Sequence, residues 1–243
     1  VTNVDDAERL IIDGQGGGDT LNYQGISLGD NRIVFTPGDV ADAGTITGFD
    51  FLGGGPSHLP MEFVELGSGG TLDIDSNSGF GLDALVVRGT DGSDTVSVQN
   101  AAGDIALTTP NGGQHLPITT GQFADLVVET LDGDDVINVD GAVTAYNSIA
   151  VFGGGPGASD VLNLIGAVAA ENVNIAPDSL NPTEQDVAGL GTPIDVAGVE
   201  LITYTGAGLN DSLVVDLGVG DNWARVEKGG RGDLVTSDSL PAV

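Results

Sequence analysis

One short unit recurs along this chain: a glycine-rich turn that ends in an acidic residue and leads directly into a strand-like segment. Six copies occur, at Gly14–Leu21, Gly89–Val96, Leu131–Ile137, Gly157–Leu162, Gly208–Leu213 and Gly230–Val235. A seventh turn, Gly67–Leu72, has the glycines but carries Thr71 in place of the acid. Recurrence at intervals of tens of residues is typical of repeat architectures, so this unit constrains the fold more than any single residue does.

Period-two alternation of apolar residues follows the turns and predicts short β-strands. The alternating pairs are Leu21 and Tyr23, Val96 and Val98, Ile137 and Val139, Leu162 and Leu164, and Leu213 and Val215. Polar residues such as Ser97 and Asn138 fall between them and are expected on the opposite face of the sheet. Glycine or proline interrupts nearly every window long enough for a helix. The sequence therefore predicts an all-β fold.

The spacing of the turns predicts how the strands are organised. The turn ends, at positions 19, 70, 94, 135, 160, 211 and 233, alternate between long and short steps. Each long step carries an extra strand-like excursion, at Arg32–Pro37, Asp104–Pro110 and Asn172–Pro177. We expect a parallel β-helix, or β-solenoid, of about three paired-coil super-repeats. A β-sandwich is the alternative, since many short strands with regular turns also produce one.

Composition limits the partners of the chain. It has 36 acidic and 6 basic residues, a net charge of −30 and no cysteine. Such a surface repels nucleic acid and anionic membranes, and no apolar run is long enough for a membrane-spanning helix. Aspartate suits turns and oxygen-ligand metal loops, although the acids of a halophilic or marine protein would serve hydration alone. We expect one elongated domain over residues 1–243, excised from a longer secreted bacterial repeat protein and stapled by metal rather than by disulfides.

The turns resemble the glycine-aspartate nonapeptide of repeats-in-toxin (RTX) proteins. The residues that match its defined positions are Gly14, Gly17, Asp19 and Leu21, then Gly89, Gly92, Asp94 and Val96, and more loosely Gly133, Asp135 and Ile137. The chain as a whole also resembles the long acidic β-solenoid repeats of giant secreted bacterial proteins. The RTX resemblance implies that successive turns hold Ca²⁺ between aspartate carboxylates and backbone carbonyls after secretion. The copies here are not in tandem, so a complete site requires turns that are distant in sequence to stack.

We therefore predict calcium ligands among the turn acids. The candidates are Asp19, Asp91, Asp94, Asp132, Asp134, Asp135, Asp160 and Asp211. Calcium takes about six to eight oxygen ligands, and stacked acids repel each other unless a cation lies between them. The alternative is that these are hydrated acids that make Asx-turns.

Catalytic motifs are not found in the sequence. No nucleophile elbow, phosphate loop or zinc spacing occurs, and the few basic residues are scattered. His58 and His115 lie in proline-containing loops that do not match each other, and we expect both to be solvated. The chain is accordingly not expected to be an enzyme.

These observations predict a non-catalytic extracellular module of a cell surface or matrix, with a structural or adhesive role, rigidified by calcium. Its expected partners are calcium, extracellular polysaccharide and neighbouring repeat modules, with no nucleic acid and no membrane insertion. The alternative function is a carbohydrate-active β-helix, either a polysaccharide hydrolase or lyase or a sugar-binding module. A solvent-facing aromatic patch would favour that alternative, with candidates Tyr23, Tyr146, Tyr204 and Trp223.

Overall fold

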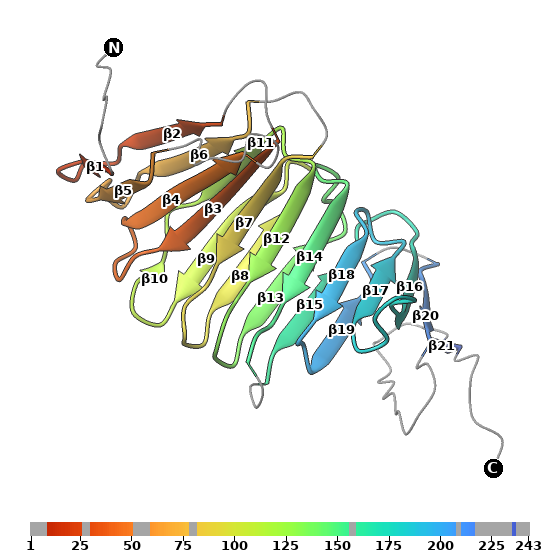
Figure 1. Ribbon diagram of the computed structural model, residues 1–243. Helices are drawn as coiled ribbons and strands as arrows, with labels where there is room; N and C mark the ends of the chain where they lie inside the picture. Colours follow the sequence, from red (N-terminus) through yellow and green to blue (C-terminus); the bar gives the residue numbers. More distant parts are fainter. Residues whose placement is uncertain are drawn as a thin grey trace.

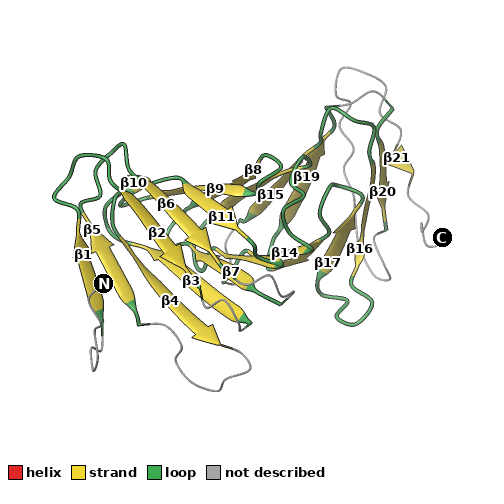
Figure 2. Ribbon diagram, turned by 90° about the horizontal axis from the view of Figure 1, so that it is seen from above, coloured by secondary structure: helices red, strands yellow, loops and turns green. Residues whose placement is uncertain are grey.

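The computed structural model describes residues 9–25, 30–50, 59–77, 82–155, 159–207, 210–216 and 235–236. Every regular element in these ranges is a β-strand, which confirms the all-β prediction. The strands form two long sheets that lie face to face as layers (Figures 1 and 2).

The larger sheet, sheet A, has twelve strands. In spatial order they are β1 (Leu10–Asp13), β5 (Met61–Val64), β4 (Gly44–Asp50), β3 (Asn31–Pro37), β7 (Ala84–Arg88), β12 (Asp125–Glu129), β14 (Ser148–Phe152), β18 (Ile194–Ala197), β17 (Gln185–Ala188), β16 (Asn172–Pro177), β20 (Ser212–Val215) and β21 (Val235–Thr236). Strands β1 and β21 thus lie at opposite ends of the sheet (Figure 1).

The smaller sheet, sheet B, has nine strands. In spatial order they are β19 (Leu201–Thr205), β15 (Val161–Ile165), β13 (Val136–Asp140), β8 (Thr95–Gln99), β9 (Asp104–Thr109), β11 (Ile118–Gly121), β6 (Thr71–Asp75) and β2 (Thr20–Gln24). The short β10 (Gly113–Gln114) pairs with β9 outside this path.

Most strand pairs are parallel, and the antiparallel pairs, apart from that of the short β10 with β9, follow one rule. Strands β4, β9 and β17 each run antiparallel between two strands that are parallel to each other. One such strand falls in each of the three long sequence steps. All three excursions predicted from the sequence are strands, but only β9 is an inserted antiparallel one. Strands β3 and β16 instead pair in parallel with β7 and β20, so for these two steps the extra strand is β4 or β17.

Inward-facing aliphatic side chains form the core between the two sheets. Val96, Ile137 and Leu162 occupy registered positions on β8, β13 and β15, and each is completely buried. Leu85, Leu126 and Ile149 do the same on sheet A. Burying such a side chain contributes about 1.5–3 kcal/mol, so the period-two alternation read from the sequence is the main source of stability here.

Two local expectations are wrong. In the seventh turn, Thr71 pairs with Thr20, so Gly70 and not Thr71 occupies the position of the acid. His115 is buried rather than solvated, because its loop lies against Ala41: the Leu116 N–H donates to the Ala41 carbonyl. Its Nε2 lies 2.9 Å from the Thr109 hydroxyl. The other histidine, His58, lies outside the described residues.

Candidate functional site

The candidate site is the corner where the chain passes from sheet A into sheet B. Strands β7, β12, β14 and β18 each lead through a turn into β8, β13, β15 and β19, and both sets of strands pair in parallel and in register. The residue just before each sheet B strand therefore lies beside its equivalent on the neighbouring strand. These residues are Asp94, Asp135, Asp160 and Glu200, which we call the corner column.

Hydrogen bonds join the members of the corner column from one strand connection to the next. The Asp94 N–H donates to Oδ1 of Asp135 at 2.7 Å, and the Asp135 N–H donates to Oδ1 of Asp160 at 2.8 Å. The Asp160 N–H donates in turn to Oε2 of Glu200 at 2.8 Å. The carboxylates of Asp135, Asp160 and Glu200 thus each accept the backbone N–H of a residue that is remote in sequence, whereas the Asp94 carboxylate accepts the N–H of Thr90 in its own turn.

The three aspartates of the corner column are removed from solvent. Asp135 and Asp160 have no exposed surface, and Asp94 is 1% exposed. Burial raises the pKa of all three carboxyl groups above the usual value. Hydrogen bonds from backbone N–H groups, and from the side chains of Thr90 to Asp94 and of Thr130 to Asp135, only partly oppose this shift. The neighbouring acids Asp94 and Asp134 raise the pKa of Asp135 further, and Asp135, Glu200 and Asp134 raise that of Asp160. Oδ2 of Asp135 and Oδ2 of Asp160 are buried without a hydrogen-bond partner.

A glycine near the end of the preceding strand makes room for the corner carboxylate. A Cβ added to Gly89 would lie 2.4 Å from Oδ2 of Asp94, and one added to Gly206 would lie 2.4 Å from Oδ2 of Asp211. The same five-residue spacing from glycine to acid occurs at Gly14 to Asp19 and at Gly166 to Glu171. At Asp135 the equivalent residue is Thr130, whose hydroxyl donates to the Gly153 carbonyl at 2.7 Å.

The same local motif serves both corners of the molecule. The turn from Gly89 to Asp94 leads from sheet A into sheet B, whereas the turn from Gly206 to Asp211 leads from sheet B back into sheet A. Asp211 therefore belongs to a different corner, where its Oδ1 accepts the Glu171 N–H at 3.1 Å. Asp211, predicted as a calcium ligand together with Asp94, Asp135 and Asp160, is therefore not brought together with these three residues.

The remaining predicted acids lie outside the corner column. Asp134 is adjacent to it but exposed, and its Oδ1 accepts the Ser159 N–H at 3.0 Å. Asp91 and Asp132 are exposed on their turns. Asp19 is also exposed, and the equivalent residue directly before the paired strand β6 is Gly70, which has no carboxylate.

Sequence reasoning missed Glu200 and Glu171. Each directly precedes a strand, as the predicted aspartates do, but neither follows a glycine-aspartate turn of the RTX type. An acid placed directly before an alternating apolar segment is the signal that would have found both.

A second ladder of polar side chains crosses the outer face of sheet B. Ser97, Asn138, Asn163 and Thr203 occupy registered positions on β8, β13, β15 and β19. The Thr203 hydroxyl donates to Oδ1 of Asn163 at 2.7 Å, Nδ2 of Asn163 donates to Oδ1 of Asn138 at 2.9 Å, and Nδ2 of Asn138 donates to Oγ of Ser97 at 3.0 Å. The four strands that follow the corner column are therefore also joined by side-chain hydrogen bonds.

The corner column does not fit a calcium ion as it is folded. Calcium requires about six to eight oxygens that converge on one point. Each Oδ1 of Asp135 and Asp160 already accepts a backbone N–H, and within the described ranges no three His, Asp or Glu side chains converge as metal ligands. Calcium binding by this chain stays a prediction.

The aromatic residues proposed for sugar contact do not form a solvent-facing patch. Tyr23 and Tyr146 are buried, and Tyr204 donates its hydroxyl to Oε2 of Glu171 at 3.1 Å. Trp223 lies outside the described residues.

Comparison of the chain with protein-family models, with curated proteins and with solved structures finds no match. In the part of the chain that the structure describes, no helix is long and apolar enough to cross a membrane.

Proposed function

We propose that this chain is a non-catalytic structural module, a segment of β-solenoid whose coils are joined at their corners by carboxylates. The observation that carries the proposal is the run of three hydrogen bonds through the corner column, from Asp94 to Glu200. In this interpretation one coil is a sheet A strand, its turn and the following sheet B strand. The parallel pairing of both sheets favours a solenoid over a sandwich, whose sheets are antiparallel.

The polar residues of the repeat support this function, because they bond to equivalent residues of the next coil and not to a common point. The corner acids bind backbone N–H groups, and the amides of Asn138 and Asn163 bind each other. A catalytic or ligand site would instead need polar groups that converge. About three paired-coil super-repeats remain part of the proposal, since β4, β9 and β17 each fall in one long step.

The location and partners belong to the same proposal. A net charge of −30 keeps the module hydrated and away from anionic surfaces, which suits a spacer or adhesive segment outside the cell. Neighbouring repeat modules, extracellular polysaccharide and calcium are the proposed partners.

Engineered disulfides test the stacking of coils, because the chain has no cysteine of its own. Ser97→Cys combined with Asn138→Cys places thiols on registered residues of adjacent parallel strands, within the Cα separation of about 4.4–6.8 Å that a disulfide requires. The matched control combines Asn138→Cys with Ala150→Cys, which are closer in sequence but lie on the outer faces of different sheets. Mass spectrometry after oxidation should find the first crosslink and not the second. The second crosslink without the first would contradict the proposed stacking of the coils.

Pulling on the two ends of the full chain in a single-molecule force experiment tests the mechanical role. We expect discrete unfolding steps, because each coil is held by the corner column and by the ladder of sheet B. Gradual extension like that of an unfolded linker would contradict the proposal. Release of reducing ends from a polysaccharide panel would also contradict it.

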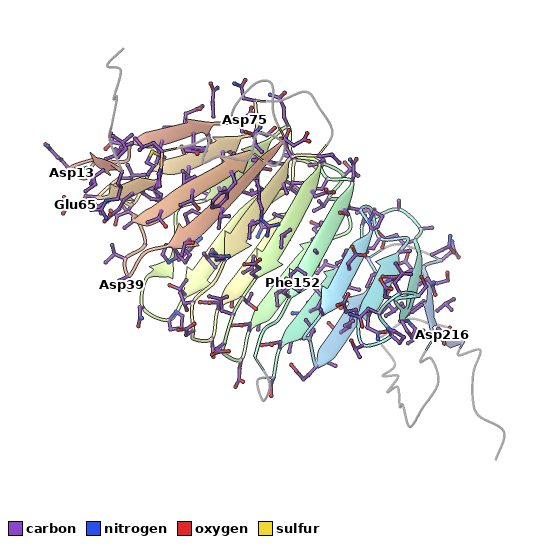
Figure 3. All side chains as sticks on the ribbon, viewed as in Figure 1. Asp13, Asp39, Glu65, Asp75, Phe152 and Asp216 are labelled. Carbon is purple, nitrogen blue, oxygen red and sulfur yellow. The ribbon has the colours of Figure 1, made fainter. Side chains whose placement is uncertain are left out.

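A sugar-binding role is the second candidate, and one surface feature favours it. Phe152 is 42% exposed on the broad outer face of sheet A (Figure 3). It lines a hollow of about 280 Å³ together with Glu129, Leu131 and Gly154. Calorimetric titration with soluble polysaccharides should then show binding that Phe152→Ala abolishes and that Phe49→Ala, at another exposed ring, does not. If the unmodified chain binds none of the polysaccharides, the sugar-binding role is excluded.

A further inference from the structure

The hairpin that joins β9 to β10 contains a buried threonine and a buried histidine that the corner column does not use. Thr109 ends β9, His115 follows β10, and both side chains are buried. The Thr109 hydroxyl lies 2.9 Å from Nε2 of His115, which is the separation of a hydroxyl group from the base that activates it. Burial keeps an external substrate away from this pair. The pair can therefore act only on a group that the hairpin itself brings to it.

The backbone nitrogen of Gly112 is such a group. Its N–H donates to the Thr109 hydroxyl oxygen at 3.0 Å. A Cβ added to Gly112 would lie 2.5 Å from Nε2 of His115, so the ring lies directly against this glycine. A threonine hydroxyl has one proton to donate and can accept two. It can therefore accept the Gly112 N–H and donate its own proton to His115, which joins the two nitrogens through consecutive hydrogen bonds.

The histidine ring is in the right protonation state to receive that proton. Burial lowers the pKa of His115, and the Ala41 carbonyl opposes this shift only in part, so the ring is neutral at neutral pH. Nδ1 is buried, and no atom meets normal hydrogen-bond geometry with it, so the contact with the Ala41 carbonyl is a long one. A carbonyl can only accept, so we assign the ring proton to Nδ1. Nε2 is then the acceptor for Thr109.

The residue before Gly112 provides an electrophile. Asn111 is exposed, and Asn111–Gly112 is the only asparagine–glycine pair in the sequence. A backbone nitrogen that loses its proton can attack Cγ of the preceding asparagine, because the two atoms close a five-membered ring and the reaction is intramolecular. Glycine has no side chain to obstruct this closure. The exposed amide can rotate toward the nitrogen, and water can reach the product.

We propose that Asn111 is a self-modification site, at which Thr109 and His115 relay the proton of the Gly112 nitrogen and so promote deamidation of the asparagine. The N–H proton passes to the Thr109 oxygen while the hydroxyl proton passes to Nε2. The Gly112 nitrogen bonds to Cγ of Asn111, the Cγ–Nδ2 bond breaks, and Nδ2 takes the proton back from the relay and leaves as ammonia. Water then opens the succinimide at either carbonyl, which gives an aspartyl or an isoaspartyl residue. This inference is independent of the stacked coils, and one turnover on the chain itself is compatible with a structural module.

The rate of deamidation in the folded and the unfolded chain tests the relay without any substitution. The full chain is incubated at neutral pH with and without urea, and peptides that contain Asn111 are followed by mass spectrometry and by isoaspartate chromatography. We expect the product to form faster in the folded chain, because only the fold brings Thr109 and His115 to Gly112. Equal or slower reaction in the folded chain would overturn the proposal.

Variants separate the relay from a merely structural hydrogen bond, because the two roles predict opposite signs. Thr109→Val removes the hydroxyl but retains the shape of the side chain. If the hydroxyl relays a proton, this change should slow deamidation by about 10-fold or more, since positioned proton transfer contributes about 10²–10⁴-fold. If the hydroxyl only holds the turn, its loss frees the Gly112 nitrogen and deamidation should become faster. An unchanged or faster reaction would therefore overturn the proposal.

Three further variants serve as controls. Thr109→Ser restores the hydroxyl and should restore the rate. Thr108→Val changes the neighbouring threonine, which is exposed, and should leave the rate unchanged. His115→Gln can still contact the hydroxyl but cannot take up its proton, so it should slow the reaction as Thr109→Val does. Melting temperatures show that each variant is folded, and the urea comparison remains decisive if Thr109→Val is not.

Discussion

Substitution of Gly89 by alanine is the sharpest test of how the corner is built. A Cβ at this position would lie 2.4 Å from Oδ2 of Asp94 and 2.8 Å from the carbonyl oxygen of Thr130. Real Cβ atoms do not approach other heavy atoms so closely. The Thr130 oxygen belongs to the backbone, so the new methyl group must displace Asp94. That movement breaks the bonds that the Asp94 carboxylate accepts from the Thr90 N–H, at 2.5 Å, and from the Thr90 hydroxyl, at 3.1 Å.

The expected cost is that of overpacking a buried site, about 1–3 kcal/mol. For a chain of this size about 1 kcal/mol corresponds to roughly 2–4 °C in Tm, so the melting temperature should fall by about 2–12 °C. Gly69→Ala is the matched control. Gly69 is exposed in an equivalent turn, and the nearest atom to an added Cβ is the Cα of Gly18 at 3.9 Å. This change should be neutral or should stabilise by about 0.4–1 kcal/mol, because it restricts the unfolded chain.

Calorimetry of the two variants beside the unmodified chain measures both effects. A fall in Tm for Gly89→Ala together with an unchanged or higher Tm for Gly69→Ala supports the packing described for the corner. Equal melting temperatures for the two variants would refute it, since the carboxylate of Asp94 would then not lie against Gly89.

Three further changes have expected outcomes. Leu162→Ala removes a fully buried side chain from the core between the sheets and should lower the free energy of unfolding by about 2–5 kcal/mol. Urea denaturation measures this loss, and a value below about 1 kcal/mol would mean that the core is not closely packed around Leu162. Asn138→Ala breaks the sheet B ladder on both sides and should cost about 0.5–1.5 kcal/mol per hydrogen bond, whereas Gln99→Ala, exposed on the neighbouring strand, should cost little. Burial lowers the pKa of His115, so the folded chain favours the neutral ring. The neutral ring stabilises the fold above the usual histidine pKa of about 6.5, and this stabilisation is lost as the pH falls below that value. The Tm difference between the unmodified chain and His115→Gln should therefore shrink on mild acidification, and a difference that grows would contradict the burial of this ring.

The strands and the inward-facing residues were predictable because both depend on local pattern. The alternation of Val96 with Val98, and of Ile137 with Val139, places these side chains on one face of any strand, whatever that strand pairs with. Of the predicted turn acids, Asp19, Asp94, Asp135, Asp160 and Asp211 each lie directly before a strand, whereas Asp91, Asp132 and Asp134 lie earlier in their turns. These features need only neighbouring residues, and the structure confirms them.

The partners of the acids were not predictable. The same sequence pattern occurs from Gly89 to Asp94 and from Gly206 to Asp211. The two turns nevertheless form opposite corners, because the first follows a strand of sheet A and the second a strand of sheet B. Glu200 completes the corner column without the glycine-aspartate turn that marks its neighbours. Assigning the strand register of the two sheets also requires the positions of the inserted antiparallel strands β4, β9 and β17.

The amino-acid sequence by itself determined the all-β composition, the face of each strand that is buried and the acid at the start of many strands, since all three are set by side-chain alternation and turn chemistry. Only the tertiary structure decided that Asp94, Asp135, Asp160 and Glu200 become neighbours, and that their carboxylates bind backbone N–H groups away from water. The physical reason is that parallel pairing joins segments separated by long connections. The length and path of those connections, and not the turn motif, determine which turns lie next to each other at a corner.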